Sequence, residues 1–244
     1  MPPLHSFTPF GPSHWAVLVL TPLTLLALVA WVRRSDGEQR ERRARAVAWT
    51  IAVVLVANLI VDDLYSLSIG TRWPEILPMQ LCDWVTLACA AALVWRRQLA
   101  YELAYFWGLA GTLQAVFTPE LSADFPSFAF VSFMLCHAGA VVAILFLTFG
   151  LRFRPVPRSI LHAFVGNQVY FVVAMAVNFS LRTNFGFLLH KPQHASLFDY
   201  LGPWPIYLLS LEGLGLVLFA LLYLPFAVAD WRRKRRQTWQ AGAA

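Results

Sequence analysis

The chain has 244 residues, of which 59% are hydrophobic and only 13% are charged. A soluble domain carries about 25% charged residues, so this composition excludes an ordinary soluble protein and indicates an integral membrane protein. The net charge of +6 does not indicate a nucleic-acid partner, because the basic residues lie in short clusters between apolar stretches.

Seven apolar stretches follow one another along the chain, and each is a candidate membrane-spanning helix. A helix needs about 20 residues to cross the hydrocarbon core of a bilayer. The expected spans are 14–32, 46–64, 79–95, 100–118, 128–149, 160–181 and 205–229. The third and fourth spans are short and are predicted to form a tight hairpin. We therefore expect an all-α, polytopic membrane protein with seven transmembrane helices, in which residues 1–244 form a single domain.

Lysine and arginine residues are divided unequally between alternate loops, which predicts the orientation. The loops after the first, third and fifth spans and the C-terminal tail carry sixteen of them, whereas the other loops carry three. Cytoplasmic loops are enriched in these residues, so we expect the N-terminus outside and the C-terminus in the cytoplasm. The three cysteines all fall within expected spans, which argues against a disulfide framework.

Polar side chains inside the expected spans are the candidate functional residues, because such groups are costly in a bilayer. Most lie in the outer half of a span, one lies near the middle, and two fall toward the cytoplasm. His137 is the residue near the middle, and Asn167 and Gln168 are the two toward the cytoplasm. The residues in the outer halves are Asn58, Asp62, Asp63, Gln80, Asp83, Gln114, Asn178 and Glu212. This one-sided distribution predicts a cavity open to the outer leaflet. The alternative is that the amides and the histidine only join neighbouring helices, while the three aspartates near the interface are hydrated.

Three segments resemble the YwaF-like family of bacterial integral membrane proteins. They are LPMQLCDW at 77–84, the dipeptide Cys136-His137, and NFGFLLHKPQHASLFDYLGPWPIY at 184–207. In that family a similar L-P-x-x-L-C-D segment opens a helix, a histidine lies mid-helix, and an aromatic segment precedes the last helix. This chain departs from the pattern at Phe185 and Ile206, where the family usually has Tyr and often has Trp. The resemblance implies that the protein lies in the cytoplasmic membrane of a bacterium.

More distantly, that family is similar to a eukaryotic transmembrane acyltransferase, which moves fatty acyl chains between phospholipids. It is also similar to the androgen-dependent intramembrane hydrolases of fatty esters. By this resemblance, Cys82 takes the position of the nucleophile and His137 that of the base. The implied partner is a membrane phospholipid or fatty acyl ester, and no cofactor or metal ion is expected.

The position of Cys82 suits thioester chemistry. It lies in the first turn after Pro78, where the helix dipole and a nearby imidazole favour a nucleophilic thiolate. Successive residues of a helix are about 100° apart, so Asp83 is expected to point away from the thiol, where it orients another polar group. By the same reasoning Cys136 is expected to pack away from His137, and Cys89 is expected to be a small core residue.

Supporting roles are open to several of the remaining polar residues. Gln80, Asn178 and Asn184 are candidate donors to an oxyanion, and the sequence does not rank them. Trp204, in the LGPWP segment, is expected to anchor the last helix at the interface, with a lid over the cavity as the alternative.

A lipid acyltransferase or esterase is therefore the favoured function. The alternative is a transporter or a lipid- or solute-binding protein that has the same polar cavity and no catalysis. A structural or assembly factor is also open. A retinal protein is excluded, because the two lysines, Lys191 and Lys234, lie in an outer loop and in the tail.

Overall fold

The computed structural model describes residues 6–192 and 197–242, so residues 193–196 of the last motif lie outside the described part. Helices make up the fold there, and this confirms the all-α prediction. The α-helices are α1 (Pro12–Arg33), α2 (Gly37–Ser68), α3 (Leu81–Trp95), α4 (Gln98–Trp107), α5 (Leu113–Phe117), α6 (Phe128–Leu145), α7 (Ser159–Leu181) and α8 (Ile206–Gly242). Shorter helices are η1 (Trp73–Ile76), η2 (Gly108–Thr112), η3 (Phe146–Gly150), η4 (Phe185–Phe187) and η5 (Leu197–Tyr200).

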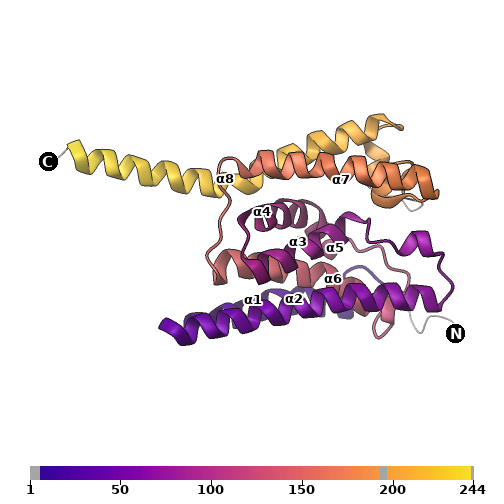
Figure 1. The fold of residues 1–244 in the computed structure, drawn as a ribbon, viewed down its shortest axis with the longest axis horizontal. Coiled ribbons are helices and arrows are strands. Elements are labelled where there is room, and N and C mark those ends of the chain that lie inside the picture. Colours follow the sequence, from indigo (N-terminus) through magenta and orange to yellow (C-terminus); the bar gives the residue numbers. More distant parts are fainter. Residues whose placement is uncertain (1–5, 193–196, 243–244) are drawn as a thin grey trace.

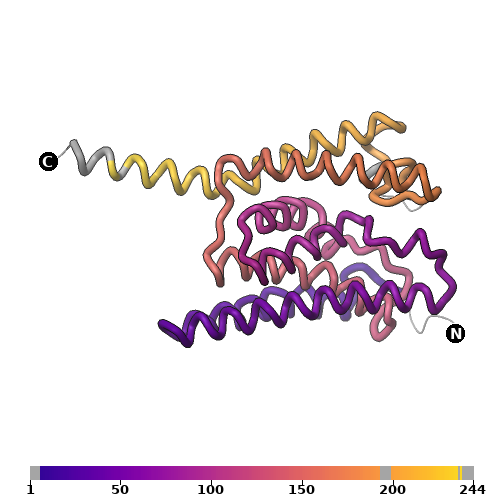
Figure 2. The backbone as a smooth tube through the Cα atoms, in the orientation of Figure 1, coloured from indigo at the N-terminus to yellow at the C-terminus, as the bar shows by residue number. Residues whose placement is uncertain are grey.

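The helices lie roughly along one direction, with α3 to α6 between two outer pairs. Helices α1 and α2 lie on one side of this centre, and α7 and α8 lie on the other (Figure 1). Helix α2 packs on α3 and α6, and α4 packs on α7. Helix α8 continues past the other helices at its C-terminal end (Figure 2).

Among the residues that the structure describes, five helices are long and apolar enough to cross a membrane, and these correspond to the first, second, fifth, sixth and seventh expected spans. The chain is therefore a multi-pass membrane protein, but the seven expected spans are not all confirmed. Helix α3 has 15 residues and is about 22 Å long at 1.5 Å per residue, less than the core thickness of about 30 Å. The fourth segment is divided by η2, a π-helical turn, into α4 and α5. The expected hairpin of these segments is present, because α3 packs on α4.

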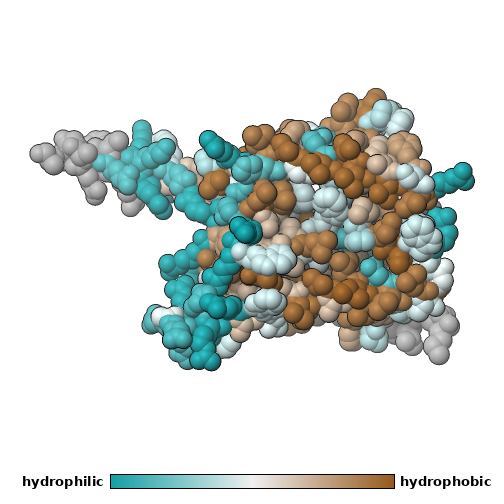
Figure 3. Space-filling model, viewed as in Figure 1, coloured by the Kyte–Doolittle hydropathy of each residue, from teal (hydrophilic) through white to brown (hydrophobic). Residues whose placement is uncertain are grey.

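The surface separates apolar from hydrophilic side chains along the helices. In Figure 3 hydrophobic side chains cover the middle of the visible face, and hydrophilic ones gather at the end from which α8 projects. This end carries Arg33, Arg34 and Arg43 beside the α1–α2 turn and Arg96 after α3. We call it the arginine-rich end, and the sequence predicts that it is cytoplasmic.

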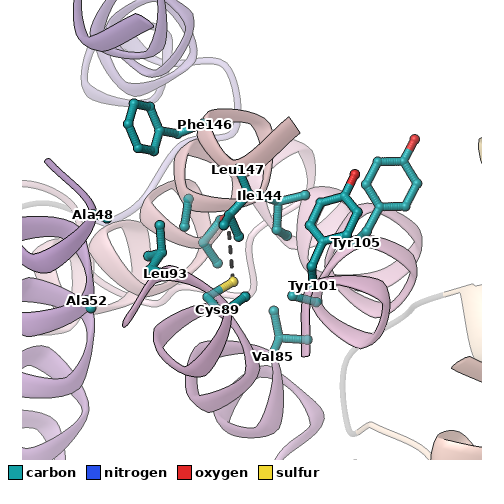
Figure 4. Packing of buried hydrophobic residues seen from close by; sticks show 14 of the residues in the cluster. Ala48, Ala52, Val85, Cys89, Leu93, Tyr101, Tyr105, Ile144, Phe146 and Leu147 are labelled. Atoms are coloured by element: carbon teal, nitrogen blue, oxygen red, sulfur yellow. Dashed lines mark hydrogen bonds between the residues drawn. The ribbon is translucent and has the colours of Figure 1, made fainter. Parts of the chain in front are cut away.

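A packed apolar core joins α2, α3, α4 and α6. Cys89 is fully buried there, with its Sγ 4.0 Å from the carbonyl oxygen of Ala140, as expected for a small core residue (Figure 4). The backbone of Gly108 comes so close to α6 that a Cβ atom on it would lie 2.2 Å from Cδ1 of Ile144. The core therefore fixes the height of α3 relative to α6, and with it the position of Cys82.

Candidate functional site

The start of α3 is held by a reciprocal pair of hydrogen bonds. The side chain of Gln80 accepts from the backbone of Asp83, and Asp83 Oδ2 accepts from the backbone N–H of Gln80 at 2.9 Å. Gln80 Oε1 also accepts from the backbone N–H of Gly186, 3.1 Å away. A capping box of this kind satisfies N–H groups that have no partner within the helix. The site therefore begins with a capped first turn, and it contains Cys82, where the sequence placed that residue.

Cys82 is half-buried in this first turn, beside the side chains of Asp83 and Cys136. Its Sγ lies 3.8 Å from Asp83 Oδ1, so the expectation that Asp83 points away is wrong. The thiols of Cys82 and Cys136 interact electrostatically, and Cys136 Sγ lies 3.7 Å from Thr86 Oγ1. Cys136, which the sequence assigned to packing, is therefore part of the polar group around the candidate nucleophile.

His137 is buried on α6, next in sequence to the cysteine that contacts Cys82. Its ring is stacked on Phe133 with 4.1 Å between ring centroids, and Nδ1 lies 2.8 Å from the carbonyl oxygen of the same residue. A carbonyl oxygen only accepts, so Nδ1 carries the proton of the neutral ring and Nε2 carries the lone pair. Within residues 6–192 and 197–242, no hydrogen bond links His137 to Cys82.

Carboxylates from α2 face the same region. Asn58 Nδ2 donates to the carbonyl oxygen of Ser132 on α6 at 3.1 Å, and the Ser132 hydroxyl donates to Asp62. Asp62 and Asp63 both lie within electrostatic range of Asp83. The structure thus brings together polar residues of α2, α3 and α6, while the cavity that the sequence predicted for them stays a prediction.

The two asparagines proposed as oxyanion donors instead organise the loop after α7. Asn178 is fully buried, and its amide bonds the backbone N–H and C=O of Phe185 and the hydroxyl of Thr183. Asn184 donates to the carbonyl oxygen of His190 and accepts from the N–H groups of Leu189 and His190. These two side chains hold the loop that contains Gly186. Because the Gly186 N–H donates to Gln80, this loop helps to fix the start of α3.

Aromatic side chains fix the remaining edges of this loop. Trp204 Nε1 donates to the carbonyl oxygen of Leu188 at 3.2 Å, which ties the start of α8 to the loop. The Tyr170 hydroxyl on α7 donates to the carbonyl oxygen of Met79 at 3.1 Å. Tyr170 has no charged group and lies well inside its apolar stretch, so sequence reasoning passed over it.

Two of the predicted residues lie apart from the thiols. Gln114 donates to Thr118 one turn along its own helix. Glu212 accepts from Asn167 at 2.8 Å and from Gln168 at 2.9 Å. The expected separation of an outer Glu212 from an inner Asn167 and Gln168 is therefore wrong. Across the described part of the chain, no three His, Cys, Asp or Glu side chains are grouped so that they could hold a metal ion.

Comparison with known proteins identifies a family whose sequence model matches this chain. The sequence model of the TMEM164 family matches residues 9–223, a range that includes Cys82 and His137. An uncharacterized protein from Treponema pallidum (strain Nichols) is 25% identical over 233 residues, which is 94% of each chain. No solved structure matches the chain. These findings give no separate support to the YwaF-like family.

Proposed function

The chain belongs to the TMEM164 family, and from this premise we propose that it is an intramembrane enzyme that transfers or hydrolyses the acyl chain of a lipid ester. Cys82 is the nucleophile in this proposal. The observation that carries it is the half-buried thiol at the capped start of α3, beside Asp83 and Cys136, with Thr86 bonded to Cys136. A thiol that served only for packing would resemble Cys89, which is fully buried among apolar side chains.

The reaction proceeds through a thioester. Cys82 Sγ attacks the carbonyl carbon of the ester, and the thiol proton passes to a base. The bond between that carbon and the alcohol oxygen then breaks, and the oxygen takes up the proton and leaves as a free hydroxyl. A second hydroxyl, from another lipid or from water, attacks the thioester. Its proton returns to the sulfur, which restores the thiol and releases a new ester or a fatty acid.

His137 is the base in this proposal. The hydrogen bond from Nδ1 to Phe133 leaves the Nε2 lone pair available for a proton. Its sequence neighbour Cys136 interacts with Cys82, and this supports a place for His137 on the segment of α6 beside the start of α3. Asp83, the nearest acceptor for the resting thiol proton, orients the sulfur.

Stabilisation of the oxyanion falls to the backbone at the start of α3. Asn178 and Asn184 are committed to loop backbone atoms, and Gln80 Oε1 is an acceptor. The N–H groups of Leu81 and Cys82 lie in the first helical turn, where no carbonyl of the same helix can accept from them. Backbone donors beside the nucleophile suit an ester oxygen that becomes negative during the attack.

The transporter alternative is less well supported, because the deep carboxylates already have partners. Glu212 accepts from Asn167 and Gln168, and Glu102 accepts from Gln98 and His162. We place the enzyme in the cytoplasmic membrane of a bacterium with the arginine-rich end inside, so the thiol serves the outer leaflet. The charge distribution of the loops supports this orientation.

The test is a trapped acyl-enzyme. Purified protein is incubated with a phospholipid that carries a labelled acyl chain, and the label on the protein is measured before and after hydroxylamine. We expect a hydroxylamine-sensitive adduct in the wild type, none in Cys82→Ala, and a weaker signal in His137→Ala.

Cys89→Ala is the matched control, because it removes a thiol from the same helix that lies in the apolar core. It should keep the adduct. An absence of label in the wild type across phospholipid classes, or an adduct that survives in Cys82→Ala, contradicts the proposal.

A further inference from the structure

Helix α1 is attached to the rest of the protein mainly at its two ends. Near its start, His14 is fully buried and its Nε2 lies 2.8 Å from the carbonyl oxygen of Val116. At its end, Val32 is fully buried and Arg33 donates to the carbonyl oxygen of Phe149 at 2.6 Å. His14 and Val32 are the buried residues of this helix. Between these ends, residues such as Leu25 and Leu28 pack on the core but are only partly buried, so the middle of α1 is less enclosed than its ends.

An apolar groove lies beside this middle section. Its walls are α1 and α2, its floor is α6, and its volume is about 880 Å³. It extends from Ser13 to Trp31 along α1, which is about 27 Å at 1.5 Å per residue and close to the thickness of the hydrocarbon core. This volume falls within the range of about 300–1,000 Å³ that is typical of small-molecule sites. Because the groove is apolar and lies in the membrane, its complementary ligand is a hydrocarbon chain.

The two ends of the groove differ in charge. At the arginine-rich end, the guanidinium of Arg43 lies 5.1 Å from the ring centroid of Trp31 and donates to its carbonyl oxygen. The turn and adjoining helix ends there carry a net positive charge, from Arg33, Arg34, Arg40, Arg42, Arg43 and Arg45 against Asp36, Glu38 and Glu41. At the other end, Ser13 donates to the carboxylate of Asp124. An anionic group is therefore attracted to one end and repelled from the other.

We propose that this groove binds an anionic phospholipid, with one acyl chain between α1 and α2 and its phosphate beside Arg43 and the neighbouring arginines. Clusters of arginine next to membrane-spanning helices attract anionic headgroups. The occupant enters from the leaflet at the arginine-rich end. This inference does not rest on the proposed function, because neither Cys82 nor His137 lines the groove.

The experiment compares two lipids that differ only in the headgroup. The purified full chain is titrated with phosphatidylglycerol and with phosphatidylcholine of the same acyl chains, and bound lipid is counted by native mass spectrometry. We expect the wild type to retain phosphatidylglycerol more strongly. Arg43→Gln should lower this preference about fivefold, whereas Arg158→Gln, at the same end but on the loop before α7, should leave it unchanged.

Filling the groove provides the second arm. Thr24 lines it at mid-height, and Leu26, two residues later, is 63% exposed and does not line it. Thr24→Trp should reduce retention of phosphatidylglycerol at least tenfold, and Leu26→Trp should not. Equal retention of the two lipids by the wild type, or equal effects of the two tryptophans, overturns the proposal. The wild-type comparison needs no variant, so it decides the headgroup assignment even if Thr24→Trp does not fold.

Discussion

Replacing Asn178 by alanine tests whether this residue stabilises the loop beside the site or takes part in the reaction. Its Nδ2 donates to the carbonyl oxygen of Phe185 at 3.0 Å, and its Oδ1 accepts from the Phe185 N–H at 2.7 Å and from the Thr183 hydroxyl at 2.9 Å. A hydrogen bond contributes about 1 kcal/mol net, and a buried group left without a partner costs about 1–3 kcal/mol. Phe185 is buried, so its backbone cannot turn to water. We therefore expect Asn178→Ala to lower the free energy of unfolding by about 3–4 kcal/mol.

Thermal unfolding of the purified protein in detergent, followed by tryptophan fluorescence, measures this loss. A decrease of this size corresponds to a fall in Tm of about 10 °C for a chain of this length. Gln114→Ala is the matched control, because it removes an amide that bonds only within its own exposed helical turn. It should change the stability by less than about 0.5 kcal/mol. If Asn178→Ala unfolds like Gln114→Ala but fails to form the acyl adduct, Asn178 acts in the reaction and the structural assignment is refuted.

Two further predictions follow from close contacts. Gly108→Ala should lower the free energy of unfolding by about 1–3 kcal/mol, because the new methyl group meets α6, and Gly111→Ala, which has open space, should be nearly neutral in the same assay. Equal melting temperatures for the two variants would contradict this packing. A short bifunctional thiol reagent, dibromobimane, should bridge Cys82 and Cys136 to a fluorescent product that is lost in Cys82→Ser and in Cys136→Ser. An unbridged wild type, with both thiols singly labelled, would show that they do not meet.

Hydropathy located the long helices well. The expected span 14–32 lies within Pro12–Arg33, and 160–181 agrees with Ser159–Leu181 to one residue at its start. The pattern failed where a helix continues beyond the membrane, because sequence rich in Arg and Lys is also a good helix former; α8 therefore runs on to Gly242. It also counted α3 as a full span, because apolar composition alone does not reveal that the helix begins only after Gln80.

The site was predictable in its position but not in its contacts. The sequence identified Gln80 and Asp83 as the start of a helix and Cys82 as its notable side chain. The contacts of Asp83 and Cys136 were predicted wrongly from the angle of about 100° between successive helical residues. That angle gives the direction of the Cα–Cβ bond and not the position of the side-chain end. A side-chain rotamer brings Asp83 to the adjacent thiol, and the packing height of α3 against α6 decides that Cys136 meets Cys82.

The predicted role of Asn178 and Asn184 as oxyanion donors was wrong for a different physical reason. Asn178 and Asn184 bond backbone groups of residues 185 and 189–190, and these bonds exist only once the loop has turned through Gly186, whose φ is +65°. A left-handed residue of this kind is accessible to glycine at little cost. From composition alone, an asparagine that closes such a loop cannot be distinguished from one that faces a cavity.

Helix α6 separates the surface of the proposed thiol chemistry from the groove that is proposed to bind lipid. Cys136 and Ala140 turn toward α3 and its cysteines, whereas Ala138 and Val142 line the groove beside α1. The side of α6 that faces α3 carries hydroxyl, thiol and carboxylate groups, which suit a reacting ester. The groove has apolar walls, which suit a bound acyl chain. Helix α6 therefore lies between the groove and Cys82. The acyl-adduct and lipid-retention experiments accordingly report on separate surfaces, and a negative result in one does not decide the other.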